Sequence, residues 1–241
     1  MLANSGAGYF FKGFELIRMK GIRRFVFIPL LINLVLFSIA FYYMFIQLQT
    51  YMEAIEAWLP EWMSWLSNVI WPVAVLFILV MFSFIFSSVA NWIAAPFNGL
   101  LSEKMEALLT NEQPPSGDAF DIIKDIPRTL SREWCKFRYY LPRAIGFFLL
   151  YWIIPVVGQI VWFLFLAWMM AVQYKDYPFD NHKINFDVMK RELQDRKGLS
   201  YSFGITTALF SMLPIVNLVV MPVAICGATA LWVDHYRSTY R

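Results

Sequence analysis

The sequence predicts an all-α integral membrane protein with two full transmembrane helices and two Pro-broken, re-entrant (hemi-penetrating) helical hairpins. Apolar residues make up 59 % of its 241 residues and charged residues only 15 %, whereas about 25 % of an ordinary soluble domain is charged. Four runs contain no charged residue, at 25–52, 62–102, 144–174 and 198–233. Each is longer than the ~20 residues that a helix needs to cross a hydrocarbon core about 30 Å thick.

The positions of the cations predict how these runs cross the membrane. All 20 Lys and Arg residues lie outside 25–103, and the linker between the first two runs carries only Glu residues as charges. Because cytoplasmic loops hold the excess of Lys and Arg, we expect every cation-bearing segment and both termini to be cytoplasmic. The first two runs then cross once each, at about 25–47 and 68–98. The third and fourth runs must leave on the side that they enter.

Both later runs contain residues suited to a turn at membrane depth. In the third run Pro155 is followed by Gly158, and in the fourth Pro214 is followed by Asn217. Proline lacks the backbone donor that a helix interior needs, and Gly and Asn favour turns. The strings PVVGQIV and PIVNLVV, which begin at the two prolines, resemble a weak internal repeat.

The arms on either side of these breaks are too short for full crossings. They contain about 11 to 16 residues, or ~17–24 Å of helix. We therefore expect re-entrant hairpins at about 144–174 and 199–233. The alternative is a pair of kinked single spans, which would place the six cations of 175–197 outside. Irregular backbone at membrane depth is tolerated only inside protein or beside water, so hairpins of this kind favour solute permeation.

The rest of the chain predicts short interfacial helices within one membrane domain, 1–241. A cytoplasmic helical segment is expected at about 103–143. Within it the apolar residues recur at helical spacing, as expected of a helix lying at the membrane surface: Leu130, Trp134, Phe137 and Leu141. The sequence contains no nucleotide-binding loop and no zinc motif, and the cytoplasmic cations account for its net charge without a nucleic acid partner.

A candidate oxyanion site lies immediately before the first span, at Gly21, Ile22, Arg23 and Arg24. Glycine ends the preceding amphipathic segment, so the next helix begins with free N–H groups and the positive end of its dipole. Together with two guanidinium groups, these donors suit a tetrahedral anion. Paired arginines at the cytoplasmic end of a first span also serve simply to fix its orientation, and that alternative stays open.

The end of the second span is a second candidate region. Pro96 and Gly99 predict a kink or local unwinding there that would expose backbone amides. Glu103 and Lys104 follow where the span emerges, either as an interfacial anchor or as a gating pair. The candidate permeation or gating residues are Asn98, Gly99, Leu100, Leu101, Ser102 and Glu103. His182 and His235 are expected to be cytoplasmic, and their roles are open.

Five strings resemble the CysZ-type sulfate permeases of bacterial inner membranes, and together they span nearly the whole chain. They are GIRRFVFIPLLIN (21–33), NWIAAPFNGLLSEKMEA (91–107), YYLPRAIG (139–146), QYKDYPFDNHK (173–183) and MPVAICGATALWVDHY (221–236). The resemblance implies uptake of sulfate across the inner membrane for sulfur assimilation and cysteine biosynthesis. It also implies two full spans with two half-penetrating hairpins and a homodimer or higher homo-oligomer. It places sulfate binding on Gly21–Arg24, which favours the site over the simple anchor.

The expected partners are sulfate, with sulfite as a second candidate anion, and membrane lipid; no metal or cofactor is expected. The charge-free runs offer no row of carboxylates for a proton relay, which favours channel-like, uncoupled flux. One competing interpretation is a non-transporting membrane scaffold or regulatory subunit. Another is an intramembrane enzyme, which would need a catalytic pair or metal ligands in runs that hold no Asp, Glu, His, Lys or Arg. We expect the protein not to be an enzyme.

Overall fold

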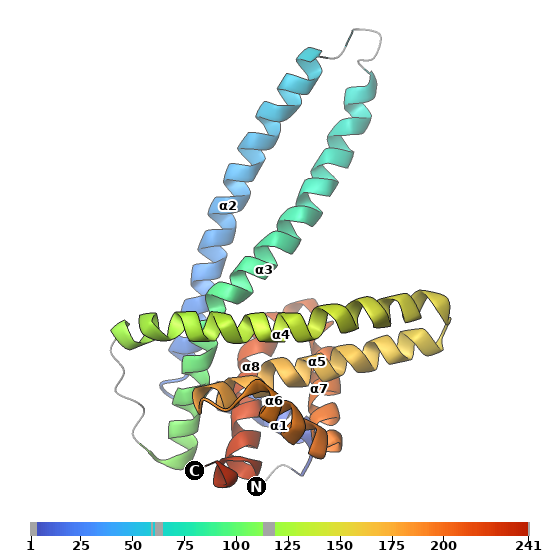
Figure 1. Ribbon diagram of the computed structural model, residues 1–241. Coiled ribbons are helices and arrows are strands. Elements are labelled where there is room, and N and C mark those ends of the chain that lie inside the picture. The colour runs from blue at the N-terminus through green and yellow to red at the C-terminus, as the bar shows by residue number, and fades with distance from the viewer. Residues whose placement is uncertain (1–3, 59, 61–64, 113–118, 241) are drawn as a thin grey trace. The chain divides into compact units, whose positions relative to one another are not determined.

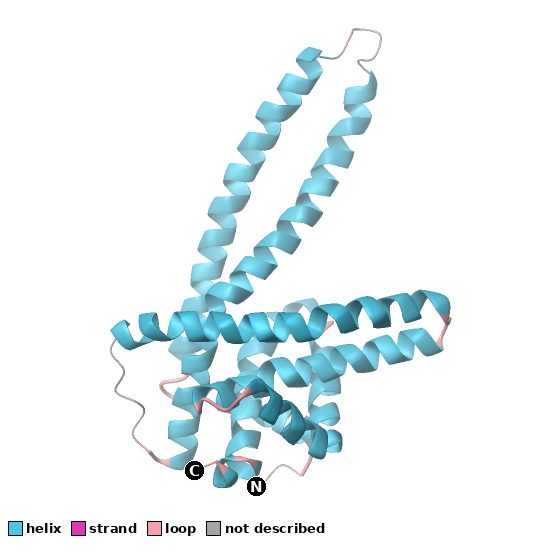
Figure 2. Ribbon diagram, in the orientation of Figure 1, coloured by secondary structure: helices cyan, strands magenta, loops and turns pink. Residues whose placement is uncertain are grey.

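The computed structural model describes residues 4–58, 60, 65–112 and 119–240, and these residues form helices and connecting turns without a strand (Figure 1, Figure 2). The helices are α1 (Gly6–Leu16), α2 (Arg23–Trp58), α3 (Ser67–Thr110), α4 (Ala119–Ile153), α5 (Val157–Asn181), α6 (Phe186–Asp195), α7 (Lys197–Ser211), α8 (Pro214–His235) and the short 3₁₀ helix η2 (Arg237–Thr239). The predicted all-α class is confirmed for this part of the chain.

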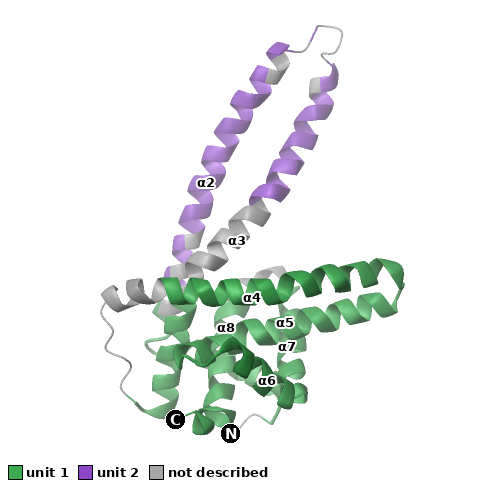
Figure 3. Ribbon diagram, viewed as in Figure 1, with its two compact units in different colours: residues 1–26, 95–241 green, residues 27–94 purple. Residues whose placement is uncertain are grey.

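The chain divides into two compact units (Figure 3). One comprises residues 27–94 and the other residues 1–26 and 95–241, so α2 and α3 each contribute to both. In the smaller unit the ring of Phe82 lies 5.4 Å from that of Phe37 and 6.0 Å from that of Phe41. Most of its other described apolar side chains are exposed, as expected of helices that face lipid.

Two helices of the described chain are long and apolar enough to cross a membrane: Leu34–Ala54 within α2, and α5. The predicted spans at about 25–47 and 68–98 fall within α2 and α3, but both helices extend beyond them. The local unwinding predicted near Gly99 is not found, because α3 is helical throughout Ser67–Thr110. Pro96 removes one helical hydrogen bond, and the burial of Leu101 and Ser102 against other helices offsets this loss.

The larger unit is a bundle in which α1 packs against α7 and α8, while α5 packs against α4, α7 and α8. Its core is apolar and aromatic, and the largest fully buried side chains include Trp232, Tyr9 and Phe10. Glycines allow the closest approaches between helices: a Cβ at Gly204 would collide with the carbonyl oxygen of Ala167, and one at Gly13 with that of Val223. Small residues at such crossings are typical of helices that pack within membranes.

Helices α4 and α5 form an antiparallel hairpin whose turn is Ile154–Val156 (Figure 1). Pro155 lies in this turn, whereas Gly158 lies in the first turn of α5, where a Cβ would collide with the carbonyl oxygen of Leu150. Val156 has a φ of +66°, an unusual value for a β-branched residue. Helix α4 continues through Pro142 to Ile153, so one helix contains part of the expected cytoplasmic segment at 103–143 and the first arm of the expected hairpin at 144–174.

Helices α7 and α8 form the second hairpin, and its turn is Met212–Leu213. Pro214 is the first residue of α8, a position where its missing N–H costs nothing. Asn217 lies in the first turn of that helix, donating its backbone N–H to the carbonyl oxygen of Leu213 at 2.8 Å.

The tips of both hairpins expose apolar side chains, although the C-terminal parts of α5 and α8 are packed into the core. Trp152 is 70 % exposed and Ile153 is 73 % exposed next to the first turn, and Met212 is 61 % exposed in the second. The four apolar residues expected on the interfacial helix also lie on the surface of α4: Leu130, Trp134, Phe137 and Leu141. Exposed apolar surfaces of this kind indicate contact with a membrane or with another protein.

Candidate functional site

The predicted anion site lies in the tight turn between α1 and α2. Gly21 has a φ of +94°, and because a Cβ there would meet nothing within 4 Å, the backbone conformation rather than space requires glycine. Ile22 is fully buried and donates its N–H to the carbonyl oxygen of Met19 at 3.2 Å. The buried Ile22 anchors the turn, and its own amide is already used.

Helix α2 begins directly after this turn, at Arg23. The first N–H groups of a helix have no partner within it and carry its positive dipole end. The side chains of Arg23 and Arg24 are exposed, and Nε of Arg23 donates to the carbonyl oxygen of Arg18 at 3.0 Å, which fixes part of its guanidinium against the turn. The structure thus brings two surface arginines to a helix N-terminus, while Ile22 contributes by packing.

The segment Asn98–Glu103 of α3 forms a polar contact line with α5 and α8. Asn98 donates an amide N–H to the hydroxyl of Tyr177 at 3.1 Å, and the carbonyl oxygen of Gly99 accepts from the Asn181 amide at 3.0 Å. The hydroxyls of Ser102 and Thr229 lie 2.9 Å apart. Leu101 is buried, and Leu100 is half-buried. Glu103 lines a cavity of about 190 Å³ at the end of this line.

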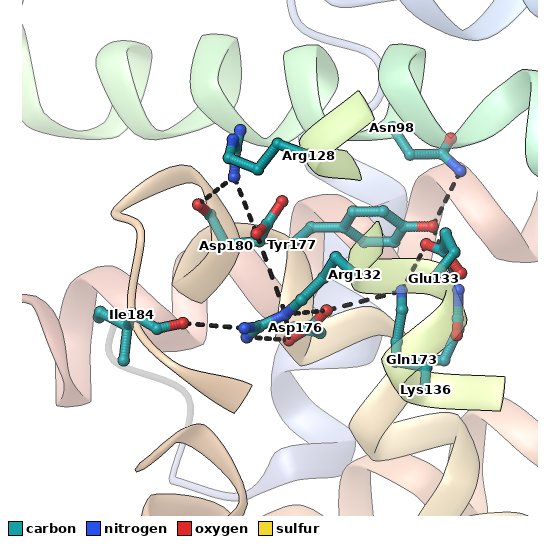
Figure 4. A network of polar contacts seen from close by, with 10 residues as sticks. All are labelled: Asn98, Arg128, Arg132, Glu133, Lys136, Gln173, Asp176, Tyr177, Asp180 and Ile184. Atoms are coloured by element: carbon teal, nitrogen blue, oxygen red, sulfur yellow. Dashed lines mark hydrogen bonds and ion pairs between the residues drawn. The ribbon is translucent and has the colours of Figure 1, made fainter. Parts of the chain in front are cut away.

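A buried ion-pair network joins α4 to α5 beside Tyr177 (Figure 4). Asp176, only 1 % exposed, accepts from Arg132 at 3.0 Å (Nε) and 2.6 Å (Nη2), and lies 3.6 Å from Nζ of Lys136. Lys136 also pairs with Glu133. Burial of unpaired charges would cost several kcal/mol each, so these cations and carboxylates depend on one another.

The same network secures the C-terminal end of α5. Arg128 donates to both the carbonyl and carboxylate oxygens of Asp180 at 2.8 Å, and Arg132 donates to the carbonyl oxygen of Ile184 at 3.0 Å. Carbonyl groups at a helix C-terminus lack helical partners and attract cations. The network therefore holds the charged end of the first hairpin together, away from the apolar turn.

Glu106 organises a second polar cluster. It accepts from Nε2 of His182 at 2.9 Å and from Nε of Arg237 at 2.8 Å, and Arg237 also donates to Glu112 at 2.6 Å. Burial alone would raise the pKa of Glu106, but the hydrogen bonds from His182 and Arg237 outweigh it and lower the pKa. The cluster ties α3 to His182, which directly follows α5, and to Arg237 in η2.

His235 joins three elements through another hydrogen-bonded chain. Its Nδ1 lies 3.1 Å from Nη1 of Arg196 and its Nε2 lies 3.1 Å from the hydroxyl of Tyr9, which donates to Asp234 at 2.8 Å. Burial and the Arg196 cation lower the pKa of His235. Both histidines thus have specific carboxylate or cation partners, which sequence patterns did not indicate.

The comparison with known families decides the assignment. A family model described as Sulfate transporter CysZ/Etoposide-induced protein 2.4 matches residues 9–222. The chain belongs to this family.

Membership of the CysZ/Etoposide-induced protein 2.4 family implies a function related to sulfate transport, with sulfate as the substrate. The family name and the apolar helices together indicate a membrane protein. Its description joins two kinds of protein, so it does not by itself assign a permease. The matched range contains the Gly21 turn, the Asn98–Glu103 contact line and both hairpin turns.

Sequence patterns missed the residues that hold the hairpin together. Asp176, Arg132 and Lys136 lie in cation-rich segments that topology rules assign simply to the cytoplasm. The one available signal was the placement of acidic residues among those cations, because long-range pairing such as Arg132 with Asp176 has no fixed sequence spacing. Among the described residues, no three His, Cys, Asp or Glu side chains gather as a metal ion would require.

Proposed function

We propose that this protein is a sulfate permease of the bacterial inner membrane that supplies sulfate for sulfur assimilation and cysteine biosynthesis. The observation that carries the proposal is the Gly21 turn, which begins α2 with two exposed arginines inside a chain of the sulfate-transporter family. A sulfate dianion is held by first-turn amides of α2 and by the guanidinium groups of Arg23 and Arg24.

The hairpins enter the membrane only part-way in this proposal. Between Arg143 and the first turn the charge-free arm of α4 is Ala144–Ile153, about 15 Å of helix and half of a ~30 Å core. The matching part of α5 is also limited, because its later residues lie beside the charged part of α4: Trp168 donates to the Tyr139 hydroxyl at 3.1 Å, and Asp176 pairs with Arg132. The exposed apolar tips support immersion, while the ion pairs stay at the cytoplasmic surface.

The topology follows from the same charge distribution, and the oligomeric state from the family resemblance. Both termini and the cationic segments are cytoplasmic, α2 and α3 each cross once, and the Leu130–Leu141 stripe of α4 lies at the membrane surface. The protein acts as a homodimer or higher homo-oligomer, transports sulfate and possesses no enzymatic activity. Flux is channel-like, because the predicted spans offer no carboxylate row for proton coupling.

Uptake of labelled sulfate into liposomes that contain the purified protein tests this function. We expect uptake well above that of empty vesicles, and a drop of roughly tenfold or more in Arg23→Ala/Arg24→Ala, since each charge-assisted contact contributes about 1.5–3 kcal/mol. The matched control is Arg18→Ala/Lys20→Ala, which removes two exposed cations from the same turn.

Three outcomes separate the parts of the proposal. Wild-type uptake no greater than in empty vesicles would reject permeation and favour a scaffold or regulatory subunit. Full uptake by the Arg23/Arg24 variant would reject the arginine site alone. An equal loss in both double variants would mean that local charge, and not a defined site, assists the anion.

A further inference from the structure

Two adjoining cavities lie at the charged end of the first hairpin, outside the candidate anion site. The larger, of about 430 Å³, is an open cavity lined by α4, α5, the end of α6 and the beginning of α7, and the smaller, of about 330 Å³, lies between α4 and α6. They share Tyr139, Arg143 and Gln194. Their volumes fall within the roughly 300–1,000 Å³ that is usual for ligand sites.

The smaller cavity and its junction with the larger one are strongly cationic. Four cations line the pair, Arg143, Lys190, Arg191 and Lys197, and among the described lining residues they face one carboxylate, Asp187, which pairs with Nζ of Lys190 at 2.6 Å and leaves three cations in excess. The guanidinium carbon of Arg143 lies 3.9 Å from the ring centroid of Tyr139, and Nζ of Lys190 lies 4.9 Å from the same centroid. One aromatic ring thus holds two cations toward a common space, where they favour an anion.

The larger cavity has an apolar wall that leads toward the hairpin tip. This wall is formed by Phe147, Val161, Leu164, Phe165 and Trp168. Its outer edge continues into exposed apolar side chains, since Leu164, Ile160 and Phe148 are all exposed. A free oxyanion would use only the cationic part, so the wall indicates a ligand that carries an apolar chain as well.

We propose that this pair of cavities binds an anionic phospholipid, with the phosphate beside Arg143 and Lys190 and an acyl chain along the Phe147–Leu164 wall. Cationic pockets at the cytoplasmic surface of membrane proteins recognise anionic headgroups through such charge complementarity. Binding there stabilises the contact of α6 and α7 with the hairpin. The proposal requires a membrane protein but does not rest on sulfate transport.

Native mass spectrometry of the purified full-length protein in detergent tests this site with phosphatidylglycerol and phosphatidylcholine as probes. We expect phosphatidylglycerol to bind at least tenfold more tightly than phosphatidylcholine. Arg143→Gln/Lys190→Gln is expected to weaken phosphatidylglycerol binding by roughly tenfold to thirtyfold, because it removes two cations that face the headgroup. Leu164→Gln is expected to weaken phosphatidylglycerol binding as well, because it places a polar side chain in the apolar wall that contacts the acyl chain.

Matched controls keep the result interpretable. Arg138→Gln/Lys183→Gln removes two exposed cations that line neither cavity and should leave lipid binding unchanged. Arg143→Lys/Lys190→Arg keeps the charge and should retain most of the binding, which shows that loss in the Gln variant is not misfolding.

The competing source of the same chemistry is a free anion. Inorganic phosphate and sulfate are therefore added as competitors, and neither should displace phosphatidylglycerol at a hundredfold excess over the lipid. Displacement by either anion, together with normal binding by Leu164→Gln, would overturn the lipid assignment. Equal binding of the two lipids would also overturn it, whatever the sulfate-uptake assay shows.

Discussion

Replacing Asp176 by Asn tests whether the buried ion pairs hold the first hairpin together. Asp176 is 1 % exposed and accepts hydrogen bonds from two nitrogen atoms of Arg132, Nε and Nη2, and Arg132 is itself only 11 % exposed. Asparagine keeps the shape but removes the charge, and it replaces one acceptor oxygen by a donor that would face the cations. Arg132 would then be a buried cation with an incomplete set of acceptors.

The expected loss follows from these contacts. Weakening two charge-assisted hydrogen bonds, each worth about 1.5–3 kcal/mol, gives roughly 3–6 kcal/mol. Loss of one partner of a buried ion pair independently suggests about 3–5 kcal/mol. At about 2–4 °C per kcal/mol for a chain of this size, we expect the melting temperature to fall by roughly 6–20 °C.

Thermal unfolding in detergent, followed by far-UV circular dichroism, measures this change. The matched control is Asp187→Asn, because Asp187 pairs with Lys190 at 2.6 Å but its side chain is 75 % exposed. Exposed pairs contribute little, so the control should melt with the wild type. Arg132→Gln added to Asp176→Asn should cost less than the sum of the two single changes. If Asp176→Asn melted with the control, the reasoning about the network would be refuted.

Three other changes test separate parts of the fold by the same unfolding measurement. Gly204→Ala should destabilise the folded protein by about 1–3 kcal/mol, because the new Cβ would collide with α5. The control is Gly198→Ala in the same helix, whose Cβ would meet nothing within 4 Å, so it should be neutral or slightly stabilising. Equal effects of the two changes would contradict the close packing at Gly204. Val156→Gly should raise stability by about 1 kcal/mol, since glycine tolerates the φ of +66°, and a decrease would show that the valine side chain matters more than its backbone. Glu106 has a pKa below its usual 4.5 in the folded protein, so its contribution to the free energy of unfolding is present above about pH 4.5 and is lost as the pH falls through the lowered pKa. Glu106→Gln should therefore make stability less dependent on pH on the acid side. An unchanged pH dependence would exclude this carboxylate as its source.

Sequence patterns predicted the helical class and the positions of the two helix breaks near Pro155 and Pro214. Charge-free runs are a local property of the sequence. Such a run forms a helix at membrane depth because only in a helix are its backbone N–H and C=O groups paired within the segment. The turn at Pro155 and the helix start at Pro214 likewise follow from local backbone chemistry. The continuation of α4 through Pro142 was not predictable, because a proline inside a helix removes one of its hydrogen bonds.

The candidate anion turn was also visible in the sequence, since glycine followed by two arginines combines a backbone signal with a charge signal. The contacts of Asn98, Ser102 and Glu106 were not, because their partners lie far along the chain. These polar groups are paired because they are buried, and their burial cannot be read from a local sequence pattern.

By itself the sequence determined that this chain forms apolar helices, where its cations gather and where its helices break, since each depends on residues close together in the chain. Only the tertiary structure decided which charges neutralise one another: Asp176 with Arg132, and Glu106 with His182 and Arg237. Coulomb attraction depends on distance in space and on burial, and neither quantity exists until the helices have packed.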